Sequence, residues 1–231
     1  MTLINDFMSL IYPRQCEACG NNLFRHEKYI CNYCKINLPK SNYHHARDTE
    51  LARVFYGRVP FENALCFYVF EKSGKVQKLL HAIKYQNQTS LAEFLGKQYA
   101  LDLLKFNTLS GVDVIVPIPL HKNKLKARGF NQSEVFAKGL SKELNILMDT
   151  KSMIRRVETE TQTRKKKFER WENVKGIFEL TDKNYLINKH VLLVDDVITT
   201  GATLEAAWEC LKEVEGIKIS VAAIAFASRK N

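Results

Sequence analysis

Short apolar runs and amphipathic stretches take turns along the chain from about residue 45 onward. Four apolar runs, bounded by polar segments, predict buried strands; they lie at 63–70, 112–119, 190–196 and 218–227. Apolar residues at helical spacing predict the helices between them; these lie at 74–85, 90–104, 132–144 and from 203 to about 214. Ser90 is expected to cap the second of these helices. Strands that alternate with helices predict a mostly parallel α/β sheet covered by helices on both faces, with ligands at the carboxyl ends of its strands.

Before residue 45 the chain has a different pattern, in which four of its six cysteines form two CxxC pairs. Cys16 and Cys19 form the first pair, and Cys31 and Cys34 form the second after eleven intervening residues. Two such knuckles supply the four sulfurs of a closed, structural zinc site. Disulfides are disfavoured in a reducing compartment, and no βαβ pattern flanks a redox CxxC. We therefore predict a small zinc-ribbon-like module at residues 1–45 and a second domain at 46–231.

The composition of the chain limits the size of its core and the compartments in which it can function. The chain has 231 residues, of which 45% are hydrophobic, enough for one sizeable core with a small appendage. It has no apolar run of about 18 residues, so no stable insertion into a membrane is expected. The N-terminal segment lacks the basic region and cleavage site of a signal peptide, so we expect a cytoplasmic protein with reduced thiols.

The formal net charge of +10 is concentrated in two stretches, Lys122–Gly129 and Arg155–Arg170. Dense Lys and Arg suit a phosphate-rich ligand or a nucleic acid. A solvated, solubilising surface explains a charge run equally well. The charge alone leaves both interpretations open.

The segment "HVLLVDDVITTGAT" joins a buried strand, two carboxylates, a loop and a helix start. Residues 199–203 lie where free backbone N–H groups and the helix dipole attract an anion, and Gly201 lets the backbone come close. The GxxxxGK[ST] pattern of a triphosphate loop is absent. Asp195 and Asp196 would repel a phosphate unless they bound sugar hydroxyls or Mg²⁺. A ribose that bears a 5′-phosphate satisfies both halves, whereas an acidic metal pocket of the receiver-domain kind gives no reason for the TTGAT that follows.

This segment resembles the 5-phosphoribosyl 1-pyrophosphate (PRPP) loop of type I phosphoribosyltransferases. The four-cysteine module, "HAIKY", "VPIPLHKNKLKARGFNQ", "TETQTRKKKFERWENVKGIF" and the loop follow in the order typical of the ComF/ComFC competence family. The resemblance covers nearly the whole chain. One departure is Lys165, which stands where relatives often carry Leu and makes that segment more basic.

The resemblance implies a type I phosphoribosyltransferase-like domain at 46–231 and a set of site residues. Asp195 and Asp196 would hold the ribose hydroxyls and help to place Mg²⁺. Arg155–Arg170 resembles the mobile loop that folds over the site, and within it Arg164 and Lys166 would join the acidic pair as catalytic residues. The remaining PRPP-binding residues implied are Thr199, Thr200, Gly201, Ala202 and Thr203 at the 5′-phosphate, Pro117 to His121 at the pyrophosphate, and Lys84 of "HAIKY".

Three functions fit this reading. The first is a phosphoribosyltransferase that acts in natural competence and DNA uptake, with Mg²⁺, PRPP and an acceptor that the sequence does not reveal. The second is a competence factor that handles single-stranded DNA alongside competence and recombination proteins, with Phe130 and Trp171 available to stack on bases. Packing in the core is the simpler explanation of Phe130. The third is a PRPP-sensing regulator without catalysis, which the intact acidic pair and loop disfavour.

Overall fold

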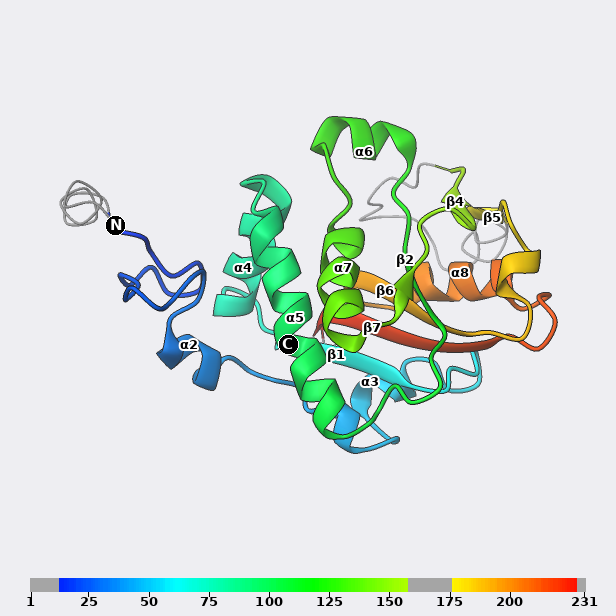
Figure 1. Cartoon of the computed structure of the whole chain (residues 1–231), viewed down its shortest axis with the longest axis horizontal. Helices are drawn as coiled ribbons and strands as arrows, with labels where there is room; N and C mark the ends of the chain where they lie inside the picture. Colours follow the sequence, from blue (N-terminus) through cyan, green and yellow to red (C-terminus); the bar gives the residue numbers. More distant parts are fainter. Residues whose placement is uncertain (1–12, 158–175, 228–231) are drawn as a thin grey trace.

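A five-stranded, wholly parallel sheet forms the centre of the protein in the computed structural model, which describes residues 13–157 and 176–227 (Figure 1). Its strand order is β1 (Ala64–Phe70), β7 (Lys218–Ala227), β6 (His190–Ile198), β2 (Val114–Pro117) and β3 (Leu147–Met148). The predicted parallel α/β sheet is therefore confirmed. All four predicted strands are present, and β3 is an added edge strand too short to be recognised in the sequence.

Helices cover both faces of this sheet, as the alternating pattern predicted. One face packs against α4 (Lys75–Tyr85), α5 (Thr89–Lys105) and α7 (Gln132–Leu144). The other packs against α3 (Glu50–Arg53) and α8 (Ala202–Leu211). Side chains of β6 alternate between the two layers, because successive residues of a strand point to opposite faces. Leu192 and Val194 join the first layer, and Val191 and Leu193 join the second.

Helices α5 and α7 approach each other unusually closely at two glycines. A Cβ on Gly96 would lie 2.2 Å from the carbonyl oxygen of Phe136, and a Cβ on Gly139 would lie 2.2 Å from that of Glu93. Both positions therefore require glycine. The contact fixes α7, whose first turn lies at the candidate site described below.

Some element boundaries differ from the prediction. Helix α5 begins at Thr89 and its N-cap is Gln88, so the assignment of Ser90 as the cap was wrong. The reason is local: Asn87 adopts a left-handed conformation, with φ of 55°, and this turns the chain into the helix earlier. Helix α8 ends at Leu211, although Val214 beyond it remains buried.

Several short elements carry too little periodicity to be predicted. They are α2 (Asn32–Asn37), η1 (Tyr43–His45), α6 (Lys122–Arg128), η2 (Asn184–Leu186) and an antiparallel pair of β4 (Met153–Arg155) and β5 (Phe178–Leu180). Helix α6 coincides with the first basic stretch.

The cysteine-rich segment packs on the rest of the chain. The rings of Tyr29 and Phe94 lie 5.4 Å apart, and the N–H of Val69 in β1 donates to the carbonyl of Pro39 at 2.9 Å. The division of the chain at residue 45 stays a prediction. Within residues 13–157 and 176–227, no helix is both long enough and apolar enough to cross a bilayer.

Candidate functional site

The acidic pair and the predicted pyrophosphate segment lie at the same edge of the sheet. Strand β6 carries Asp195 and Asp196 near its carboxyl end. In the neighbouring strand, Pro117 is in register with Val194, and the N–H of Ile118 donates to the carbonyl of Val194 at 2.8 Å. The carboxyl end of β2 therefore lies directly beside the acidic pair. This is the place at which parallel α/β sheets bind ligands.

Asp195 is the buried member of the pair, with 9% of its surface exposed. Its Oδ1 accepts hydrogen bonds from the Ser133 hydroxyl at 3.1 Å and from the N–H of Asp196 at 2.8 Å. Burial, and then the negative charge of Asp196, raise the pKa of Asp195 to about 7. Without a ligand, this carboxyl group is therefore protonated in a substantial fraction of molecules at neutral pH.

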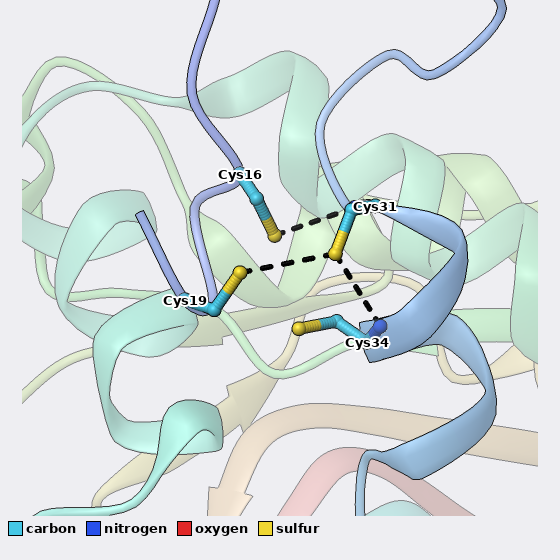
Figure 2. A group of neighbouring side chains, drawn as sticks. All are labelled: Cys16, Cys19, Cys31 and Cys34. Carbon is cyan, nitrogen blue, oxygen red and sulfur yellow. Dashed lines mark hydrogen bonds between the residues drawn. The ribbon is translucent and has the colours of Figure 1, made fainter. Parts of the chain in front are cut away.

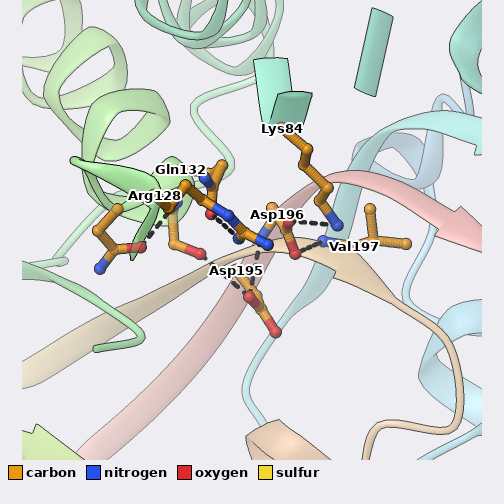
Figure 3. A network of polar contacts seen from close by, with 8 residues as sticks. Lys84, Arg128, Gln132, Asp195, Asp196 and Val197 are labelled. Atoms are coloured by element: carbon orange, nitrogen blue, oxygen red, sulfur yellow. Dashed lines mark hydrogen bonds and ion pairs between the residues drawn. The ribbon is translucent and has the colours of Figure 1, made fainter. Parts of the chain in front are cut away.

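Asp196 forms an ion pair with Lys84, the residue that the "HAIKY" motif had suggested. Lys84 Nζ lies 2.6 Å from Asp196 Oδ2, and the N–H of Val197 donates to Asp196 Oδ1 at 2.7 Å. Figure 3 shows Lys84 extending from the last turn of α4 to this carboxylate. Residues 84 and 196 come together only through packing of α4 against the sheet, so the structure supplies a contact that the sequence could not.

The "GFNQ" motif links the segment after β2 to the acidic pair. Asn131 is the N-cap of α7: its side chain accepts from the N–H of Ser133 at 3.2 Å and donates to the carbonyl of Ile118 at 2.9 Å. Ser133 in turn donates to Asp195. These buried contacts tie the segment after β2 to the acidic pair. The sequence alone did not indicate roles for Asn131 and Ser133, although their position at the start of an amphipathic helix was an available signal.

The loop of residues 199–201 joins β6 to α8, which opens with Ala202 and Thr203. Gly201 adopts φ of 77°, and a Cβ there would lie 2.5 Å from the Phe55 ring, so glycine is required twice over. The N–H of Ala202 makes a long bond, 3.4 Å, to the Thr200 hydroxyl. Among the described residues, none accepts a hydrogen bond from the N–H of Gly201 or from the N–H of Thr203. A helix start with free donors can accept an anion.

The remaining predicted residues are distributed as follows. The His121 side chain is buried and caps α6, accepting from the N–H of Asn123 at 3.4 Å. Arg164, Lys166 and Trp171 lie outside the described residues, so their assigned roles stay predictions. Phe130 packs against the core, as its simpler explanation required.

The four cysteines come together as their spacing predicted (Figure 2). Their sulfurs all lie within 4.8 Å of one another, and the Cys19 and Cys31 sulfurs are 3.8 Å apart. The edge of a tetrahedron with Zn–S bonds of about 2.3 Å is about 3.8 Å. Cys31 also accepts from the N–H of Cys34 at 3.4 Å, as the N-cap of α2. This cluster could hold a metal ion such as zinc.

Comparisons with known proteins agree with this geometry. The family model of the phosphoribosyl transferase domain matches residues 131–231, a range that includes the acidic pair and the loop. The DNA utilization protein YhgH of Escherichia coli (strain K12) is 28% identical over 192 residues, which cover 82% of this chain and 80% of that protein. Competence protein ComFC of Bacillus subtilis (strain 168) is 28% identical over 200 residues, covering 86% and 78%. Competence protein F of Haemophilus influenzae is 32% identical over 148 residues, covering 62% and 64%. Residues 131–231 therefore match a phosphoribosyl transferase domain, and most of the chain is similar to competence and DNA utilization proteins.

Proposed function

We propose that this protein binds PRPP at the carboxyl edge of the sheet and transfers its phosphoribosyl group to an acceptor. The observation that carries the proposal is the arrangement on β6 and α8: two adjacent carboxylates are followed within a few residues by a helix start with free N–H groups. The carboxylates of Asp195 and Asp196 accept hydrogen bonds from ribose hydroxyls, and the donors at 199–203 take the 5′-phosphate.

The chemistry needs positioning more than it needs a nucleophile on the protein. The bond between ribose C1 and a pyrophosphate oxygen breaks, and pyrophosphate leaves with the electron pair. The acceptor atom forms its bond to C1 and loses a proton. The transition state has a cationic, oxocarbenium-like sugar, which nearby carboxylates stabilise, and a leaving group whose growing charge favours nearby cations. Residues 117–121 and Lys84 contact the pyrophosphate side in this proposal.

The donor set fits Mg²⁺ as a partner of PRPP. Asp195 and Asp196 offer hard carboxylate oxygens, which Mg²⁺ prefers, and Mg²⁺ typically completes its shell with substrate phosphates and water. Bound there, the ion would neutralise charge on the departing pyrophosphate. Burial and mutual repulsion disfavour two negative charges on the ligand-free pair, and a cation relieves this cost.

Zinc held by Cys16, Cys19, Cys31 and Cys34 has a structural role in this proposal. Four sulfurs fill the coordination shell and leave no open position for catalysis. The cluster lies in a segment with little apolar core of its own, so the metal stabilises a fold that packing alone would support poorly.

The names of the relatives, competence protein and DNA utilization protein, suggest that this activity serves natural competence and the use of incoming DNA. A second function is favoured by the net charge of +10 and by α6, which carries Lys122, Lys124 and Lys126 within five residues. This second function is the binding of single-stranded DNA by a protein that keeps the phosphoribosyltransferase scaffold but has lost transfer activity.

The double variant Asp195→Asn with Asp196→Asn separates these functions. We expect PRPP affinity, measured calorimetrically with Mg²⁺, to fall by an order of magnitude or more, because charge-assisted hydrogen bonds contribute roughly 1.5–3 kcal/mol each. Single-stranded DNA affinity should be unchanged or slightly higher, because two negative charges are removed. Glu209→Gln with Glu213→Gln removes the same charge from the last turn of α8 and the segment just after it, and should leave PRPP binding intact. Equal PRPP affinity in both double variants would contradict the proposal.

In a competent host, loss of transformation with DNA binding retained would assign the function to PRPP chemistry. Normal transformation by the Asp195→Asn, Asp196→Asn variant would assign it to DNA handling instead.

A further inference from the structure

Arg58 contacts the candidate phosphate loop from a part of the chain 142 residues earlier. It follows α3, before the first strand. One guanidinium nitrogen, Nη2, donates to the carbonyl of Thr200 at 3.0 Å, and Nη1 lies 3.5 Å from Oε2 of Glu205. A single side chain therefore holds both the loop and the first turn of α8.

The contact with Thr200 determines which way the next amide points. A trans peptide unit is planar, and its C=O and N–H groups point in opposite directions. No peptide bond in the described residues is cis. Because Arg58 holds the carbonyl of Thr200, the N–H of Gly201 points away from Arg58, and it has no acceptor among the described residues. The Phe55 ring blocks the same loop at Gly201, where a Cβ would lie 2.5 Å away. Arg58 thus turns the Gly201 N–H away from its own guanidinium, and Phe55 packs against the Cα of Gly201.

The contact with Glu205 removes an electrostatic obstacle. Glu205 is the acidic residue in the first turn of α8, and its carboxylate would compete with an incoming phosphate for the positive end of the helix dipole. Pairing with Arg58 compensates this charge.

We propose that Arg58 is a positioning residue that holds the loop of residues 199–201 ready for a 5′-phosphate without touching the phosphate itself. The identity of the ligand in this inference rests on the proposed function. The effect of Arg58 on the loop does not depend on that function. The Arg58 side chain is 35% exposed, and exposed ion pairs add little to global stability. Its loss should therefore alter the loop and its ligand far more than the melting temperature.

The test compares Arg58→Ala with Arg53→Ala, a matched control on the same segment whose guanidinium pairs with exposed Asp48 instead. In the ligand-free protein, we expect hydrogen exchange of the Glu205 N–H, which donates to the Gly201 carbonyl at 2.9 Å, to become about tenfold faster in Arg58→Ala and to be unchanged in Arg53→Ala. Arg58→Lys, which can reach the carbonyl or the carboxylate but not both in one bidentate geometry, should be intermediate.

A binding measurement with two ligands tests whether the effect of Arg58 is specific to the 5′-phosphate. The affinity for ribose 5-phosphate should fall by at least fivefold in Arg58→Ala, while the affinity for inorganic pyrophosphate, which does not use this loop, should stay within twofold of the wild type. Wild-type exchange and wild-type ribose 5-phosphate binding in Arg58→Ala would overturn the inference, as would an equal loss of both ligands. If the wild-type protein binds neither ligand, the proposed function fails, and the exchange measurement still decides the role of Arg58.

Discussion

Lys84 Nζ lies 2.6 Å from Asp196 Oδ2, so a positive charge already lies beside the acidic pair before a ligand binds. The two charges of opposite sign are both largely shielded from solvent, with 26% and 18% of their side chains exposed. One carboxylate is compensated by lysine, and the other, Asp195, shifts toward its protonated form. The site thus tolerates two adjacent carboxyl groups before any ligand arrives.

Replacement of Lys84 should weaken PRPP binding. In Lys84→Met the lost ammonium no longer orients Asp196 or attracts the pyrophosphate, and we expect the Kd for PRPP to rise about tenfold, equivalent to about 1.4 kcal/mol. Titration calorimetry with Mg²⁺ present measures this. Lys78→Met, at an exposed position of the same helix, is the control. Indistinguishable affinities for the two variants would remove Lys84 from the site.

Asp195→Asn should stabilise the ligand-free protein at high pH. The folded-state pKa of about 7 exceeds the ordinary value of 3.8, so the folded protein holds the proton more tightly than the unfolded chain does. Stability therefore falls as pH rises between these values, and above pH 7 the buried charge costs its full amount. The Asn side chain avoids this cost, and its single carbonyl oxygen can accept both bonds that Oδ1 of Asp195 accepts from Ser133 and Asp196.

Urea unfolding in Mg²⁺-free buffer tests this pH dependence. We expect Asp195→Asn to exceed the wild type by about 2 kcal/mol at pH 8.5, below the roughly 4 kcal/mol that the full pKa difference would allow. The advantage should shrink markedly at pH 5.5. Glu213→Gln, at an exposed carboxylate, should show no such trend. An advantage that does not depend on pH would mean that burial of the charge is not the cause.

Gly201→Ala should abolish the loop geometry. The substitution combines a left-handed φ of 77° with a clash of 2.5 Å against the Phe55 ring, and we expect a loss of about 2–4 kcal/mol of stability together with loss of PRPP binding. Gly57→Ala isolates the backbone contribution, because Gly57 has φ of 70° and nothing within 4 Å of the added Cβ. We expect this control to lose only about 1 kcal/mol and to retain PRPP binding. Similar losses in both variants would show that the contact with Phe55 is unimportant.

The cysteine cluster should contain about one zinc ion per chain after anaerobic purification, as measured by elemental analysis. Cys31→Ser should lose the metal and lower the melting temperature by at least about 5 °C, because metal binding is coupled to folding of the segment. Cys210→Ser, outside the cluster, should retain it. Protein that carries no zinc and melts like Cys31→Ser would contradict the assignment.

The sequence by itself determined the features that depend on local pattern. Periodicity specified four of the five strands of the central sheet and the longer helices that cover it, since apolar spacing directly reflects which face is buried. The spacing of Cys16, Cys19, Cys31 and Cys34 predicted their cluster because two short knuckles bring their own sulfurs together. Asp195, Asp196 and the loop at Gly201 were also recognisable, because strand, carboxylates and helix start are contiguous.

Only the tertiary structure decided the contacts between distant segments. Lys84 meets Asp196, Ser133 meets Asp195, and Arg58 meets Thr200 because helices and strands far apart in the chain pack on one sheet. No local pattern encodes such pairs, since each depends on how a distant segment packs beside β6. The Ser133–Asp195 contact depends in addition on the close approach of α5 and α7 at their glycines. The raised pKa of Asp195 has the same origin, because it follows from burial beneath elements that are not adjacent to it in the sequence.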